Sequence, residues 1–120
     1  MNAEQAIHSF WSSFEVAAYD ENSVPETAQL PYITYGLSYD SFDNNVTMNA
    51  SIWDRSTSWQ YVTQKAHDIY DYIGYGGKII PTNNGGIWMK RGNPFYQRVG
   101  EDEKNIKRIY LNITAEYFDL

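Results

Sequence analysis

The stretch that decides the fold is residues 46–74, VTMNASIWDRSTSWQYVTQKAHDIYDYIG. Apolar residues alternate from Val46 to Ile52, which predicts a strand with one buried face. From Trp59 to Ile73 the apolar residues recur at intervals of three and four, which predicts an amphipathic helix. A strand that leads directly into a helix, both with one apolar face, indicates a layered domain that contains both kinds of element.

The ends of this helix are also marked in the sequence. Thr57 and Gln60 have the spacing of a capping box, which predicts the helix start. Gly74 stands where a glycine ends a helix, since glycine adopts the left-handed conformation at low cost. We therefore expect Trp59 to open the buried stripe and to belong to the core, so that Trp59→Ala costs about 3–5 kcal/mol.

Periodicity and turn residues predict the other elements. They are an amphipathic helix over residues 3–14, a polar connector over 17–31, a strand over 32–38 paired with 46–54 in a hairpin, a second hairpin from 78–82 and 86–91, a loop over 92–105, and a long final strand over 106–118. This order predicts an α+β fold, with two helices packed on a mostly antiparallel sheet of about five strands. The length fits a single domain over residues 1–120.

Composition excludes several classes of protein. The chain has no cysteine, which rules out disulfides and thiolate metal sites, and no apolar run is long enough to span a membrane. The start of the sequence lacks the features of an export signal, so we expect assembly in a cytoplasm. The net charge of −6 disfavours tight binding to nucleic acid.

The charge is divided unevenly along the chain. Residues 1–54 contain eight acidic residues and no Lys or Arg, whereas residues 55–120 contain all nine basic residues against seven acidic ones. Such a chain can pack head-to-tail, with the acidic surface of one copy against the basic surface of the next. The alternative is that the two halves mix in the folded domain.

We predict no catalytic, cofactor or metal site. The glycines of residues 74–78 follow a helix instead of preceding one, so a phosphate-binding loop is disfavoured. The two histidines, His8 and His67, are isolated and are expected on helix surfaces. The carboxylates at residues 40–43 and 101–103 lie in expected turns, where such side chains usually bind local backbone.

Three blocks carry a family resemblance: residues 52–60 (IWDRSTSWQ), 87–98 (IWMKRGNPFYQR) and 106–113 (IKRIYLNI). Their residues, order and separation resemble the tail terminator, or tail-completion, proteins of bacteriophages with long non-contractile tails. The resemblance covers nearly the whole chain and is weakest over residues 15–31.

The resemblance implies a structural virion protein at the head-proximal end of the tail. It implies a homo-oligomer, a hexameric ring that caps the tail tube, stops its polymerisation and joins the tail to the head connector. The implied partners are the major tail tube protein and the head-completion protein, and DNA passes through the ring without specific binding. The family has no active site, no cofactor and no membrane association.

Other readings remain open. A head-closure protein of the same neck region shares the size and setting. A carbohydrate-binding module would use Trp53, Trp59 and Trp88 as a stacking platform, and a small enzyme would have to rely on carboxylates.

The candidate interface residues are aromatic, basic or apolar residues expected at the surface. They are Trp53, Arg55, Lys90, Arg91, Phe95, Tyr96, Arg98, Val99 and Arg108. The sharpest expectation concerns residues 92–105, predicted to be a docking arm that is mobile in the monomer and ordered on assembly.

Overall fold

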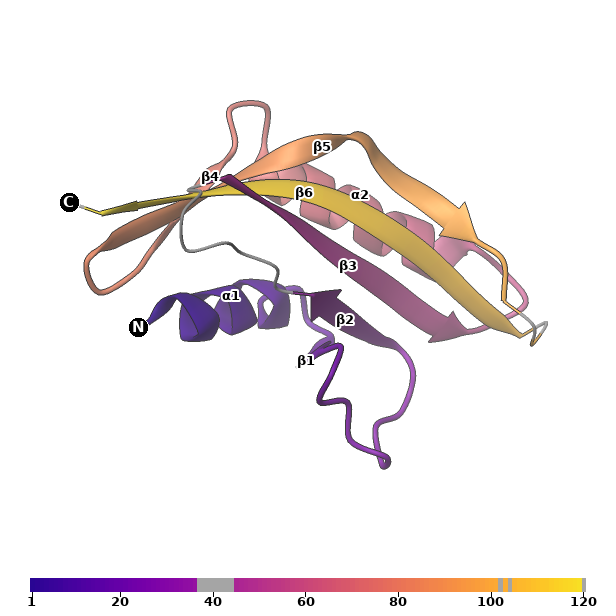
Figure 1. Cartoon of the computed structure of the whole chain (residues 1–120). Coiled ribbons are helices and arrows are strands. Elements are labelled where there is room, and N and C mark those ends of the chain that lie inside the picture. Colours follow the sequence, from indigo (N-terminus) through magenta and orange to yellow (C-terminus); the bar gives the residue numbers. More distant parts are fainter. Residues whose placement is uncertain (37–44, 102, 104, 120) are drawn as a thin grey trace.

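A computed structural model describes residues 1–36, 45–101, 103 and 105–119, and the turn expected at residues 40–45 lies largely outside this part of the chain. The described residues form two helices and six strands, arranged as in Figure 1. They are α1 (Ala3–Ser12), β1 (Ala17–Asp20), β2 (Tyr32–Gly36), β3 (Asn45–Arg55), α2 (Gln60–Ile73), β4 (Lys78–Pro81), β5 (Gly85–Val99) and β6 (Ile106–Asp119). Neither helix has the length and apolar content needed to cross a membrane.

The strands form one sheet in the order β1-β2-β3-β6-β5-β4. β1 runs parallel to β2, and every other neighbouring pair is antiparallel. The predicted α+β architecture is confirmed, as are the β2–β3 and β4–β5 pairs. The sheet has one strand more than expected, because residues 17–20 of the predicted connector form β1.

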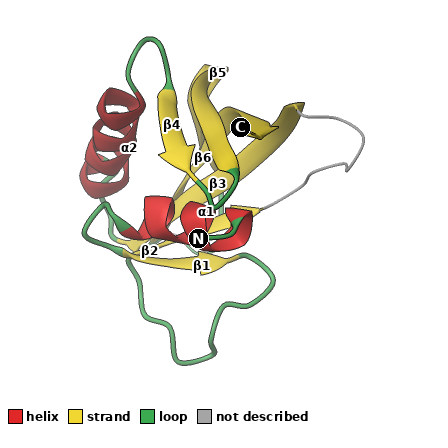
Figure 2. Ribbon diagram, turned by 90° about the vertical axis from the view of Figure 1, so that its left-hand side faces the viewer, coloured by secondary structure: helices red, strands yellow, loops and turns green. Residues whose placement is uncertain are grey.

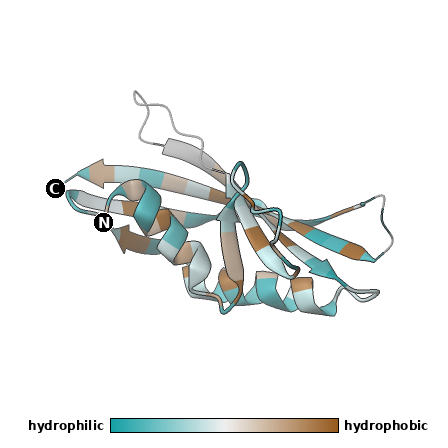
Figure 3. Cartoon of the chain, turned by 90° about the horizontal axis from the view of Figure 1, so that it is seen from below, coloured by the Kyte–Doolittle hydropathy of each residue, from teal (hydrophilic) through white to brown (hydrophobic). Residues whose placement is uncertain are grey.

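One face of the sheet carries the core. Alternate residues of the two central strands are buried on it: Met48, Ala50, Ile52, Ile109, Leu111, Ile113 and Ala115. This is the alternation that the sequence predicted, and Figure 3 shows it as bands of contrasting hydropathy along the strands. Each fully buried Ile or Leu side chain contributes about 1.5–3 kcal/mol. The opposite face, here called the outer face, carries the intervening residues.

The two helices supply the rest of the core. α1 buries Ala6, Ile7, Phe10 and Trp11, and α2 buries Val62, Ala66, Ile69 and Ile73. α2 packs on β3, β5 and β6, whereas α1 contacts both β1 and β4, the two end strands of the sheet. α1 therefore bridges the two edges of a curled sheet (Figure 2).

The start of α2 differs from the prediction. Trp59 is the N-cap residue and its side chain makes no capping bond, so the capping box of Thr57 and Gln60 is wrong. Instead the Gln60 N–H donates to Ser58 Oγ at 3.1 Å. Ser58 precedes Gln60 by two residues and is one residue closer to the helix than Thr57. The C-terminal cap is confirmed, since Gly74 has φ +76° and its N–H donates to Tyr70 O at 3.1 Å.

The loop predicted over residues 92–105 is also wrong in its first half. β5 continues to Val99 and pairs with β6 on both sides of an irregularity, over Gly85–Arg91 and again over Tyr96–Val99. Gly92 and Pro94 fall within this irregularity. The bulge absorbs the two residues that interrupt regular pairing, and the ladder resumes beyond it. Residues 92–99 therefore do not form a separate docking arm.

Candidate functional site

Many basic side chains in the described part of the chain lie over aromatic rings. Seven such pairs occur, where about one per 70–80 residues is usual. They are Lys65–Tyr61, Lys78–Tyr72, Lys90–Trp88, Arg91–Tyr70, Arg98–Trp59, Lys107–Trp59 and Arg108–Trp53. Seven of the nine Lys and Arg side chains thus lie over an aromatic ring.

The outer face is organised around Trp53 and Arg108, which lie directly opposite each other in β3 and β6. The Arg108 guanidinium is 4.5 Å from the Trp53 ring centroid. Trp53 Nε1 donates to Thr34 Oγ1 at 2.9 Å. Arg108 Nε donates to Ser51 Oγ at 3.0 Å, and Nη1 is 3.5 Å from Glu101 Oε1. Both side chains are therefore held in fixed positions on this face.

A second cluster lies at one end of the molecule, where β3 and β5 end and where α2 and β6 begin (Figure 1). The Arg98 guanidinium is 4.8 Å from the Trp59 ring centroid, and Lys107 Nζ is 5.7 Å from it. Arg55 Nη1 lies 2.6 Å from Glu103 Oε1 in an exposed ion pair. We call Arg55, Arg98, Lys107 and Arg108, with Trp59, the basic end.

The structure brings several predicted interface residues together at this end. Arg108 of β6 lies in register with Val99 of β5 on one side and with Trp53 of β3 on the other. Arg55 follows Trp53 at the end of β3, and Arg98 precedes Val99 on the opposite face of β5. Five of the nine candidate residues thus lie within one region.

Lys90 and Arg91 lie in the first half of β5, away from the basic end, and make contacts within the chain. Lys90 Nζ is 4.3 Å from the Trp88 ring centroid and 3.7 Å from Glu116 Oε2. Arg91 lies 3.3 Å from the Tyr70 ring centroid, and its Nε and Nη2 donate to Tyr70 O at 3.0 and 2.7 Å. Arg91 therefore clamps β5 to the end of α2.

Phe95 and Tyr96 follow the bulge and differ in exposure. Phe95 is 8% exposed and packs edge-on against Tyr70, with 5.3 Å between ring centroids. Tyr96 is 37% exposed and meets His67, at 5.6 Å between ring centroids. Phe95 belongs to the core of the domain, whereas the Tyr96 side chain is partly at the surface.

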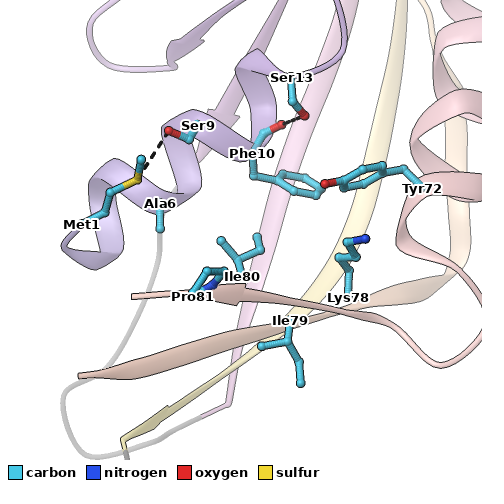
Figure 4. Close-up of a pocket in the computed structure, with 10 residues that line it drawn as sticks. All are labelled: Met1, Ala6, Ser9, Phe10, Ser13, Tyr72, Lys78, Ile79, Ile80 and Pro81. Atoms are coloured by element: carbon cyan, nitrogen blue, oxygen red, sulfur yellow. Dashed lines mark hydrogen bonds between the residues drawn. The ribbon is translucent and has the colours of Figure 1, made fainter. Parts of the chain in front are cut away.

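An apolar recess of about 330 Å³ lies between α1 and β4 (Figure 4). The residues that line it are Met1, Ala6, Ser9, Phe10, Ser13, Tyr72, Lys78, Ile79, Ile80 and Pro81. The Phe10 and Tyr72 rings meet across it, with 5.8 Å between centroids. Sequence reasoning missed this recess because its walls lie about seventy residues apart in the chain.

Two phenols, of the buried Tyr35 and the partly buried Tyr61, lie near acidic side chains. Burial, with the charges of Asp20 and Glu4, raises the pKa of Tyr35. The Tyr35 hydroxyl lies 2.9 Å from His8 Nδ1 and stays protonated at neutral pH, so it can donate to that nitrogen. Burial, with Asp54 and Asp68, raises the pKa of Tyr61.

Among the described residues, no three His, Asp or Glu side chains are grouped to hold a metal ion. Trp53, Trp59 and Trp88 each have a cation over the indole ring, so a sugar stacking there would compete with that cation. What the surface offers is a set of rigidly held aromatic and cationic groups.

Neither a protein-family model nor a curated protein matches the sequence. The fold is similar to that of a chain in a solved structure described as the virion of a native gene transfer agent (GTA) particle. The TM-score is 0.58 and the sequence identity 16%, and the alignment covers 95% of this chain and 85% of that chain. The likeness therefore extends over the whole domain and is one of fold.

Proposed function

We propose that this chain is a structural subunit of a phage-type particle. In this proposal it caps the tail tube as an oligomeric ring, stops polymerisation of the tube and joins the tail to the head connector. The observation that carries the particle role is the fold likeness to a chain of the gene transfer agent virion, over 95% of this chain. The place at the head-proximal end of the tail rests on the three sequence blocks that resemble tail terminators.

The arrangement of those blocks supports one shared role. Residues 52–60 end β3 and lead into α2, residues 87–98 lie in β5, and residues 106–113 lie in β6. β3, β6 and β5 are neighbours in the sheet, so the three blocks form one continuous region that includes the basic end. A continuous region that contains rigidly held aromatic and cationic groups is suited to binding a protein partner.

The proposed subunit acts without catalysis and without a cofactor. Its partners are further copies of itself, the tail tube protein and a head-completion protein, and DNA passes through the ring. Rings form from head-to-tail contacts between unlike surfaces of identical subunits. The uneven charge along the sequence provides such unlike surfaces.

The test is electron microscopy of purified tail tubes mixed with the protein. We expect one additional ring at one end of each tube, and we expect tubes of uncontrolled length from particles produced without the protein. Binding along the whole length of the tubes would contradict a terminator role. Binding to isolated heads but not to tubes would instead identify a head-closure protein.

A further inference from the structure

We propose that the basic end of one copy docks on an acidic segment, residues 15–26, of the next copy. The inference rests on the proposed ring and specifies the contact that builds it. The acidic segment contains Glu15, Asp20, Glu21 and Glu26, and no basic residue occurs before Arg55. It includes β1, which lies at the opposite edge of the sheet from β4.

The basic end is ready to receive a carboxylate. Arg55 and Arg108 already lie against Glu103 and Glu101, whereas Arg98 is exposed and lies against an indole ring. Arg98 takes part in no ion pair within the described residues. Stacking holds its guanidinium in place, so less side-chain entropy is lost when a partner binds.

The start of α2 adds to the positive potential at this end. Trp59, over whose indole ring Arg98 lies, is the N-cap residue of the 14-residue helix. The first turn of this helix contains no acidic residue. The helix N-terminus contributes about half a positive charge. A carboxylate that approaches Arg98 therefore meets two sources of positive potential together.

The acidic segment makes no ion pair within the described part of the chain, although Asp20 Oδ1 accepts from the Asn22 N–H at 2.9 Å. The three ion pairs of the described residues use the carboxylates of Glu101, Glu103 and Glu116, so none involves residues 1–36. Glu15, Glu21 and Glu26 are exposed and Asp20 is partly exposed. Four carboxylates in twelve residues repel one another, and a cationic partner relieves this repulsion. Within this chain the basic end is the matching surface.

The two surfaces lie on different parts of the subunit. The basic end is formed where β3 and β5 end, and the acidic segment lies at the β1 edge (Figure 1). A contact between unlike surfaces repeats from copy to copy in one direction and closes into a ring when the rotation permits. The occupant of the basic end is therefore a second copy of this chain.

The test is a charge swap measured by sedimentation velocity over a range of protein concentrations. Arg98→Glu reverses the basic end, and the double variant Glu21→Lys, Glu26→Lys reverses the acidic segment. Each variant alone brings like charges together, so we expect assembly at least about tenfold weaker than in the wild type. An equimolar mixture of the two restores opposite charges at every contact, so we expect assembly to return with the variants alternating. The milder Arg98→Gln serves if Arg98→Glu unfolds, and we expect weaker assembly from it as well.

Matched controls change the same charges elsewhere. Lys78→Glu lies on β4 and Glu4→Lys lies on α1, so both should assemble like the wild type. Raising the salt from about 0.1 M to about 1 M should weaken wild-type assembly, because exposed charges are then screened.

The outcomes separate the contact from the function. If the wild type assembles and Arg98→Glu assembles equally well, the contact is wrong while the ring stands. The same conclusion follows if the mixture fails to recover. If the wild type stays monomeric at every concentration and adds no ring to tail tubes, both the contact and the proposed function are overturned.

Discussion

Arg98 lies over the indole ring of Trp59, with 4.8 Å between the guanidinium carbon and the ring centroid, and so joins the end of β5 to the start of α2. Trp59 is only partly buried, packed against the edge of the core. The expectation that Trp59 is a full core residue therefore needs revision. Trp59→Ala should cost about 2–3 kcal/mol, less than for a fully buried tryptophan.

A double-mutant cycle measures the pair itself. Arg98→Ala, Trp59→Ala and the double variant should give a coupling free energy of about 0.5–1 kcal/mol in urea unfolding, as for exposed cation–aromatic pairs. Additive effects would show that Arg98 does not stabilise Trp59. Lys78→Ala combined with Trp59→Ala is the control, because Lys78 contacts Tyr72 instead.

Adjacent residues of β3 should respond differently to truncation. Ile52 is fully buried, so Ile52→Ala should cost about 2–5 kcal/mol. Trp53 lies on the outer face and donates to Thr34 Oγ1, so Trp53→Ala should cost about 1–2 kcal/mol and also impair assembly. Thermal unfolding of both variants checks the order, and equal losses would mean that the outer face is packed like the core.

Phe95 and Tyr96 test whether the second half of β5 is part of the monomer. Phe95→Ala should cost about 3–5 kcal/mol, because the ring is buried against Tyr70. Tyr96→Ala should cost less than about 1 kcal/mol, because that side chain is on the surface. Amide exchange of Phe95 and Tyr96 should be slow where the N–H group is hydrogen-bonded to β6 and fast where it is not. Fast exchange throughout residues 95–99 in the monomer would restore the docking arm.

The periodic elements could be predicted because each has a long apolar pattern. β3, β6 and α2 repeat apolar residues over seven or more positions, and burial on one face of the domain satisfies the whole pattern. β1 could not be found this way. It has only four residues, too few for an apolar pattern, and it forms because it pairs with β2.

Local signals failed where tertiary pairing outweighed them. Gly92 and Pro94 indicated a loop, but a bulge accommodates both while β5 continues beside β6. At α2 the Thr57–Gln60 spacing matched a capping box that does not form. A capping box does form at α1, where none was predicted, and in it the Gln5 N–H donates to Asn2 Oδ1 at 2.8 Å.

The candidate site was predictable as a set of residues but not as pairs. Alternation placed Trp53 and Arg108 away from the apolar residues of their strands. That the two lie opposite each other depends on the register of β3 against β6, to which the whole core contributes. The Arg98–Trp59 contact depends in addition on where α2 lies against the sheet.

Alkaline unfolding should report the surroundings of Tyr35. Its folded-state pKa lies above the ordinary value of 10.0, so above about pH 10 the unfolded chain loses its proton first. Stability from this group is fully present below pH 10 and is lost as the pH rises through the folded pKa. Tyr35→Phe should therefore flatten the decline of unfolding free energy above pH 10. Tyr61→Phe should do the same, and the double variant should flatten it further.

Gly92 should tolerate no side chain. A Cβ at this position would lie 2.6 Å from the Asn112 carbonyl oxygen of β6, closer than real contacts, and the atoms that it meets are Asn112 backbone and Cβ, which cannot give way as the end of a flexible side chain could. Gly92→Ala should therefore cost about 1–3 kcal/mol, because the bulge must shift or the pairing of β5 with β6 must loosen. Gly100 is the matched control, since a Cβ there meets nothing within 4 Å and the residue does not have the positive φ that favours glycine. Gly100→Ala should leave stability unchanged or raise it by about 0.4–1 kcal/mol through the less flexible unfolded chain. Urea unfolding of the two variants decides the matter, and equal stabilities would mean that β5 does not approach β6 closely at the bulge.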